Sequence, residues 1–135
     1  MRFNFRSTYF SSLIALAFAA GFNSFAQTSE VLNLAGSEWG PENGFDQFVQ
    51  FKAEGELFGF GGCNSFIGNY TYEAGNLSIK NLILTEATCA GLTGVEAAFM
   101  EGLQNAHTVK MDGLLLKVYD KNDVWVLGLS RRDFD

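Results

Sequence analysis

The chain has 135 residues, with 9 Lys and Arg against 15 Asp and Glu, so its formal net charge is −6. This length is enough for one small domain and too short for two. The excess of acidic residues gives the chain a negative field that repels phosphate groups. Nucleic acid and anionic lipid are therefore excluded as partners bound through long-range charge.

Residues 1–26 have the layout of a secretory signal peptide. Arg2 and Arg6 form a positively charged start, residues 13–22 are apolar, and small residues occupy positions −3 and −1 of a cut after Ala26. A membrane anchor needs about 18 or more apolar residues, so we expect cleavage, which leaves 7 basic and 15 acidic residues and a net charge of −8. We therefore expect a periplasmic or secreted protein with no membrane anchor after cleavage.

Cys63 and Cys89 are the two cysteines of the chain, and neither lies near the predicted cut, where a lipid anchor needs one. In an oxidising compartment two cysteines are more often bridged than free. We therefore predict a Cys63–Cys89 disulfide, with a reactive thiol as the alternative. The cysteines and the one histidine, His107, fall short of the four ligands of a zinc site, so we predict no metal site.

After a short tail at 27–34, a single domain is expected over 35–135. Runs of aromatic and β-branched residues, several with period-two alternation, follow one another between turn signals. Gly59 and Gly61 fall inside the second run, where glycine favours close packing, a bulge or a bend. Strands are predicted at 45–53, 56–62, 63–72 (after an initial turn), 77–79, 81–85, 108–111, 114–119 and 124–129.

One helix is predicted over 94–106. Thr93 and Glu96 fit a capping box, in which the Thr93 hydroxyl accepts a hydrogen bond from the Glu96 amide and the Glu96 carboxylate reaches back. Val95, Phe99 and Leu103 recur every four residues and form one apolar stripe.

The order of these elements predicts an α+β fold that is mostly β. Turn signals recur every 8–12 residues, and Asp112-Gly113 is the strongest hairpin signal in the chain. About eight short strands and one helix favour an antiparallel, barrel-like sheet with the helix packed on it.

Several motifs occur in an order typical of one family. A G-C-N-x-x-x-G-x-Y pattern begins at Gly62, and a T-x-x-x-C pattern ends at Cys89. With these motifs the chain resembles the META/HslJ domain family over about residues 34–129. The resemblance implies a compact β-rich domain with a packed helix, export, and a link to envelope stress. It supplies no catalytic residue, and the chain lacks the cysteine that anchors some relatives to lipid.

Asn64 has two interpretations. Gly61 and Gly62 let the chain turn sharply into Cys63, and the Asn64 side chain can hydrogen-bond the backbone nearby. The motif then staples this turn to the loop around Cys89 before the helix. The alternative is that Asn64 contacts a ligand or a partner.

No catalytic set is evident, so we predict that the protein is not an enzyme and uses no cofactor. Nucleophilic catalysis needs a nucleophile beside a base, and His107 stands alone at the predicted helix end, where the helix dipole favours it. The chain has no G-x-S-x-G elbow, P-loop or G-x-G-x-x-G motif. Glu86 is predicted to be partly buried in a structural hydrogen bond.

Aromatic side chains are dense on the early strands. Phe48 falls on the opposite strand face from Val49, and Phe58 and Phe60 fall opposite Leu57. These residues either form the core of a small barrel or leave an apolar patch, which commonly marks a binding surface. The candidates for that surface are Asn64, Phe48, Phe58, Phe60 and Phe66.

The leading hypothesis is an exported, non-enzymatic domain that is monomeric and binds an envelope protein. The second is a carrier of a small apolar ligand, held in the barrel or in a cleft under the helix. A barrel filled by its own side chains contradicts that second hypothesis. The third, an enzyme that uses Glu86 or His107, is the least favoured.

Overall fold

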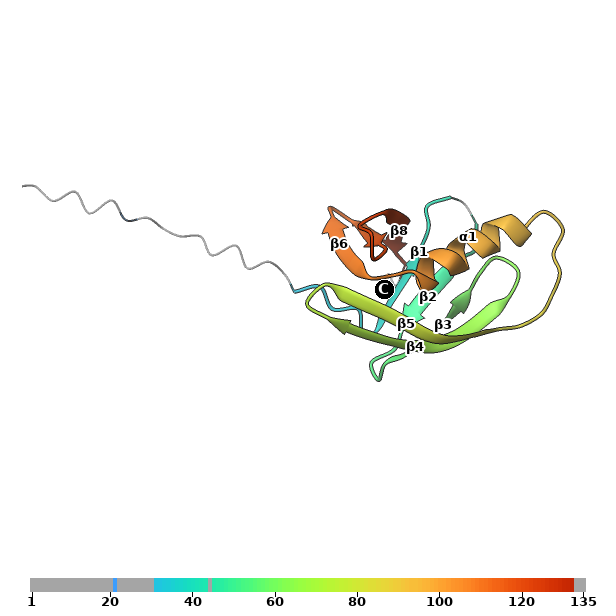
Figure 1. The fold of residues 1–135 in the computed structure, drawn as a ribbon, viewed down its shortest axis with the longest axis horizontal. Coiled ribbons are helices and arrows are strands. Elements are labelled where there is room, and N and C mark those ends of the chain that lie inside the picture. The colour runs from blue at the N-terminus through green and yellow to red at the C-terminus, as the bar shows by residue number, and fades with distance from the viewer. Residues whose placement is uncertain (1–20, 22–30, 44, 133–135) are drawn as a thin grey trace, which may run out of the picture.

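The computed structural model describes residue 21 and residues 31–43 and 45–132. Within these residues, eight antiparallel strands close into a barrel in chain order, and one helix, α1 (Thr93–Gln104), packs on it (Figure 1). This architecture confirms the predicted fold class. Except for residue 21, the predicted leader lies outside the described residues. The strands are β1 (Ser37–Gly40), β2 (Phe48–Phe51), β3 (Glu56–Phe60), β4 (Ser65–Glu73), β5 (Asn76–Leu84), β6 (Thr108–Asp112), β7 (Leu115–Tyr119) and β8 (Trp125–Arg131).

The eight strands are not the eight that the sequence pattern predicts. The pattern misses β1, which has only four residues, and it divides β5 into two strands. The division falls at Lys80, directly before Asn81, which has a φ of 56°. Two residues of β5, Asn81 and Leu82, stand opposite Gly68 alone, so the strand continues through a β-bulge.

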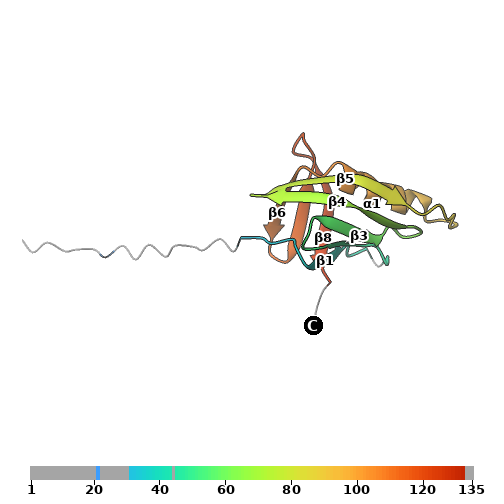
Figure 2. The same ribbon diagram turned by 90° about the horizontal axis from the view of Figure 1, so that it is seen from below.

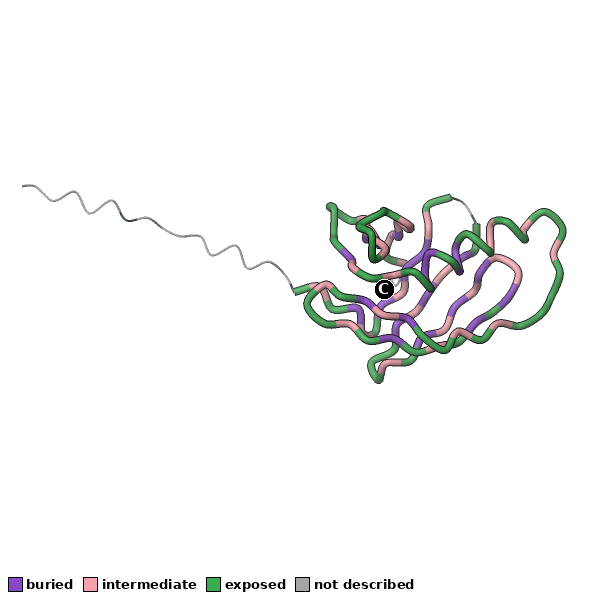
Figure 3. The backbone as a smooth tube through the Cα atoms, viewed as in Figure 1, coloured by how far each residue is buried: buried purple, intermediate pink, exposed green. Residues whose placement is uncertain are grey.

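The barrel interior is filled by side chains that alternate along the strands. Val49 and Phe51 on β2 point inward, and the Phe51 ring meets the Tyr70 ring edge-on at 4.9 Å. Figure 3 shows buried positions interspersed with half-buried and exposed ones along the barrel. Full burial of each large apolar side chain stabilises the fold by about 1.5–3 kcal/mol. Leu34, which the pattern assigns to the tail, is 0% exposed and belongs to this core.

Helix α1 is anchored differently from the prediction. It begins after Leu92 without a side-chain cap, so the predicted capping box of Thr93 and Glu96 is wrong. The Glu96 carboxylate instead accepts hydrogen bonds from the turn between β3 and β4. The predicted apolar stripe is correct, because Phe99 and Leu103 are buried in the barrel core.

The helix packs against β5, one of the two strands at the weakest seam of the barrel. Strands β5 and β6 pair at one position, Asn76 with Thr108, and α1 contacts both β5 and β8 (Figure 2). A Cβ atom on Gly102 would lie 2.4 Å from Cγ of Leu127, so glycine allows the helix to approach β8 closely. A covering helix protects an open strand edge from pairing with other chains. In the described part of the chain, no helix has the length and hydropathy needed to cross a membrane.

Candidate functional site

Asn64 is a structural residue in this fold, and it does not line a surface. It is 6% exposed, and its amide oxygen accepts hydrogen bonds from the Thr85 hydroxyl at 2.9 Å and the Ala87 amide at 2.6 Å. Its amide nitrogen donates to the Ala87 carbonyl at 3.1 Å and to Glu96 Oε1 at 2.7 Å. These four hydrogen bonds use both ends of the side chain. The staple interpretation therefore fits the geometry, and a ligand contact at Asn64 does not.

Glu96 completes this staple from the helix side. Its Oε2 atom accepts hydrogen bonds from the backbone amides of Cys63 at 2.9 Å and Asn64 at 2.5 Å. A Cβ atom on Gly61 would lie 2.9 Å from the Glu96 side chain, so glycine makes room for the carboxylate. Partial desolvation raises the pKa of Glu96, but the hydrogen bonds from Asn64 and Cys63 more than offset this effect and leave the pKa below its ordinary value.

We expect Glu96→Gln to remove part of the acid sensitivity of folding. Because the pKa of Glu96 is lower in the folded than in the unfolded state, its contribution to stability is complete above about pH 4.5 and is lost as the pH falls through the folded-state pKa. At pH 7 the substitution should lower the free energy of unfolding by roughly 2 kcal/mol. Below pH 4.5 its stability should fall less steeply than that of the parent chain. Urea unfolding across this pH range measures both effects.

The matched control is Glu101→Gln, which changes an exposed acid on the same helix. It should keep the acid sensitivity of the parent chain. Equal pH profiles for the two variants contradict the role given to Glu96.

The disulfide lies beside this cluster. The Cys63 and Cys89 sulfurs are 2.11 Å apart, and their Cα atoms are 5.8 Å apart. The structure thus agrees with the predicted pairing, and both cysteines are bonded rather than free. The bond ties the β3–β4 turn to the loop before α1, at the place where Asn64 and Glu96 hold the same two segments together.

Part of the exposed apolar surface lies on the outer face of β2–β5. Exposed apolar side chains also occur at β6–β8 and their turns: Met111, Leu114, Val124 and Trp125. Phe48, Phe58 and Phe60 point outward and are half-buried, and the Phe48 and Phe58 rings meet edge-on at 5.9 Å. Of the two interpretations left open by the strand alternation, their position fits the outer patch and not the core. Phe66, the remaining aromatic candidate, points inward, and its ring lies 6.3 Å from that of Phe99. Phe66 therefore belongs to the core and does not line the patch.

Two isoleucines that the sequence analysis did not single out extend this face. Phe58 pairs with Ile67 on β4, and Ile67 pairs with Ile83 on β5. Side chains at paired positions project from the same face of a sheet, so the three form a row across the strands. Ile67 is 58% exposed and Ile83 is 65% exposed. We name the row of Phe58, Ile67 and Ile83 the apolar row.

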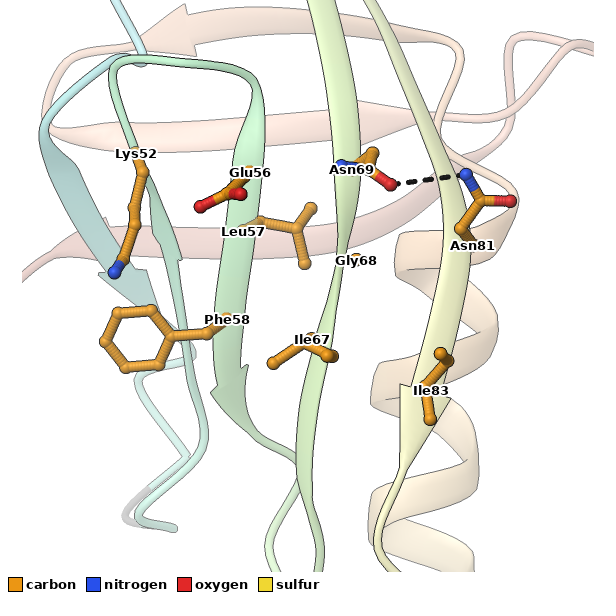
Figure 4. A pocket seen from close by; sticks show the side chains of 9 residues that line it. All are labelled: Lys52, Glu56, Leu57, Phe58, Ile67, Gly68, Asn69, Asn81 and Ile83. Carbon is orange, nitrogen blue, oxygen red and sulfur yellow. Dashed lines mark hydrogen bonds between the residues drawn. The ribbon is translucent and has the colours of Figure 1, made fainter.

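A hollow of about 540 Å³ lies along the apolar row (Figure 4). Gly68 and Asn81 line it at the β-bulge, which bends β5 at this point. The Asn81 amide nitrogen donates to Asn69 Oδ1 at 3.2 Å, on the upper right of Figure 4. Lys52 and Glu56 line the opposite side. The hollow thus combines an apolar floor with a polar rim.

The structure does not bring together Glu86 and His107, the two residues considered for catalysis. Glu86 is exposed, which corrects the predicted partial burial, and it follows the end of β5. His107 is also exposed, and its carbonyl accepts a hydrogen bond from Leu77 near the start of β5. At about 3.3 Å per strand residue, the two lie roughly 25 Å apart. In the described ranges, no group of three or more His, Cys, Asp and Glu residues is placed to hold a metal ion.

Comparisons with known proteins agree with this fold. A family model described as the META domain matches residues 27–131. An NMR structure of a protein from Burkholderia xenovorans is similar with a TM-score of 0.59 at 19% identity, over 75% of this chain and 85% of that one. A crystal structure of a DUF4847 family protein from Bacteroides vulgatus has a TM-score of 0.51 at 19% identity, over 67% of this chain and 62% of that one. At these identities the two structures show the fold alone. No curated protein matches the chain.

Proposed function

This chain belongs to the META domain family, and from that premise we propose that it is an exported, non-enzymatic domain that binds another protein of the envelope. The binding surface is the outer face of β2–β5. The observation that carries the proposal is the apolar row, in which two isoleucines are more than half exposed. Large apolar side chains gathered on one face of a small domain commonly mark an interaction surface.

The disulfide supports the proposed location. Disulfides persist in the periplasm and outside the cell, and they are rare in the cytosol. The Cys63–Cys89 bond therefore fits a periplasmic or extracellular protein. Residues 1–26, which are predicted to direct export, lie outside the described residues except for residue 21. The link to envelope stress, which the family resemblance implies, is part of the same proposal.

The packing of the core counts against the carrier of a small apolar ligand. Trp39, Phe51 and Phe66 are buried inside the barrel, and Phe99 and Leu103 fill the space under the helix. The hollow at the apolar row lies on the outside of the sheet. A ligand site inside the barrel or under the helix would require these side chains to move apart.

Site-specific photo-cross-linking tests the proposal. A photoreactive amino acid is placed at Ile83 and, as a control, at Leu114, which is 88% exposed on the turn between β6 and β7. In cells that export the protein, we expect one partner to be cross-linked at position 83 and not at position 114. With that partner purified, the double variant Ile67→Ser and Ile83→Ser should weaken the Kd by about tenfold or more.

Two results contradict the proposed function. One is equal cross-linking from positions 83 and 114, which shows random collision. The other is an unchanged Kd for the double variant, which shows that the partner binds elsewhere. Both isoleucines are largely exposed, so the double variant is expected to fold, and a circular dichroism spectrum checks this.

A further inference from the structure

We infer that the segment of the partner that docks on the apolar row is a cationic amphipathic helix with three apolar side chains along one side. The inference rests on the proposed function, because it names the chemistry of the partner for the same surface. It draws on the dimensions of the row, on the distribution of charge over the barrel, and on the charges beside the row.

The dimensions of the apolar row match one side of a helix. Its three residues stand on three adjacent strands, and neighbouring strands are about 4.8 Å apart. Phe58 and Ile83 are therefore separated by about 10 Å. Residues i and i+7 of an α-helix are about 10.5 Å apart along the axis. A helix that lies across the strands can thus place apolar residues i, i+3 or i+4, and i+7 against the row, as in other helix-in-groove complexes.

Charge is distributed unequally over the barrel. Residues 31–107, which include β1–β5 and α1, contain nine acidic and two basic residues, a net charge of −7. Residues 108–132, which form β6–β8, contain three acidic and five basic residues, a net charge of +2. In the closed strand order, β7 and β8 lie across the barrel from β3 and β4. The side that carries the apolar row therefore attracts cations, and complementary charge steers a basic partner toward it.

The charges beside the row agree with this distribution. Phe58 pairs with Gln50 on β2, and Gln50 pairs with Glu38 on β1, so Glu38 lies on the same line across the strands as the apolar row. Glu56 lines the hollow. Glu54 and Glu86 are exposed in the segments that follow β2 and β5. Neither of the two ion pairs found among the described residues involves these four acids. They are available to pair with lysines or arginines that flank the apolar side of a helix.

Two cations lie beside the row: Lys52, which lines the hollow, and Lys80, which pairs with Asn69 on β4 at its edge. The Lys52 ammonium group lies over the Phe58 ring, 5.0 Å from the ring centre, at the edge of the hollow (Figure 4). A cation in this position is attracted by the face of the ring. The Phe58 ring therefore holds Lys52 at one edge of the hollow, and the acids around the row outnumber the two lysines.

Two synthetic helical peptides of about 18 residues test the inference. Both peptides carry leucine at i, i+3 or i+4, and i+7. The remaining positions are lysine in the first peptide (Leu/Lys) and glutamate in the second (Leu/Glu). The exported, disulfide-bonded protein is titrated with each peptide by fluorescence anisotropy. We expect the Leu/Lys peptide to bind and the Leu/Glu peptide not to bind. The affinity should fall about tenfold between roughly 50 and 500 mM NaCl, because salt screens exposed charges.

Variants distinguish docking of the peptide on the apolar row from non-specific electrostatic attraction between the peptide and the acidic protein. The double variant Ile67→Ser and Ile83→Ser should weaken binding of the Leu/Lys peptide by about tenfold, whereas Leu114→Ser should leave it unchanged. Equal affinity for the two peptides, or an unchanged affinity in the double variant, overturns the inference. The inference is also overturned if the protein forms a dimer and Ile83→Ser abolishes that dimer. The apolar row then binds a second copy of the chain.

The outcomes distinguish this inference from the proposed function. If neither peptide binds but position 83 still cross-links a partner that the double variant loses, the face binds a partner of different chemistry. The inference then fails, and the proposed function stands. If the cross-link at position 83 is also absent, both fail.

Discussion

We expect Phe99→Ala to lower the free energy of unfolding by about 3–5 kcal/mol. Phe99 is 3% exposed, and its ring packs against Phe66 in the barrel core. Removing a buried aromatic ring loses its transfer free energy and leaves a cavity that the surrounding side chains fill only in part. The effect should be large because Phe99 is one of the side chains by which α1 covers the barrel. Urea unfolding followed by circular dichroism measures the change.

The matched control for this prediction is Glu101→Ala, two residues further along the same helix. Glu101 is exposed, so its replacement should change stability by less than about 0.5 kcal/mol. A loss below about 1 kcal/mol for Phe99→Ala would mean that Phe99 does not anchor the helix.

Removing the disulfide should also lower stability strongly, by about 3.5 kcal/mol in the double variant Cys63→Ala and Cys89→Ala. The bond closes the loop from Cys63 to Cys89, a sequence separation of 26, and a loop of this length restricts the unfolded chain by about that free energy in the chain-entropy model. The native fold should persist, because Asn64 and Glu96 still join the β3–β4 turn to the loop and the helix.

Reductant provides the control for the disulfide prediction. Reducing the parent chain should lower its melting temperature to nearly that of the double variant, and the double variant should not respond to reductant. An unchanged melting temperature in both experiments contradicts a stabilising disulfide. A near-ultraviolet spectrum that collapses in the double variant contradicts the independent role of Asn64 and Glu96.

Part of the candidate site could be predicted from the sequence. Alternation along β2 and β3 placed Phe48, Phe58 and Phe60 on the strand faces opposite Val49 and Leu57, because successive side chains of a strand project to opposite faces. It left open whether these rings form the core or an outer patch. The same principle could not reveal the apolar row, because the row depends on which residues of β3, β4 and β5 stand opposite one another. That register includes a bulge at Asn81, where the sequence pattern indicated the start of a separate strand.

Glu96 shows a similar limit. Its position three residues after Thr93 fits a capping box by local spacing alone. In the folded chain, the backbone amides of Cys63 and Asn64 lie within 2.9 Å of its carboxylate. A residue more than 30 positions away in the chain therefore decides what the side chain binds, and no local pattern contains that information.

The sequence by itself determined the fold class, the residues that share each face of the early strands, the apolar stripe of the helix and the family. Each of these follows from local periodicity or from motifs that lie close together in the chain. Only the tertiary structure decided that Asn64 and Phe66 are internal, that Glu96 joins the helix to the β3–β4 turn, and that Ile67 and Ile83 form a surface with Phe58. These features arise from contacts between residues distant in sequence, which form only when the barrel closes and places the strands in register.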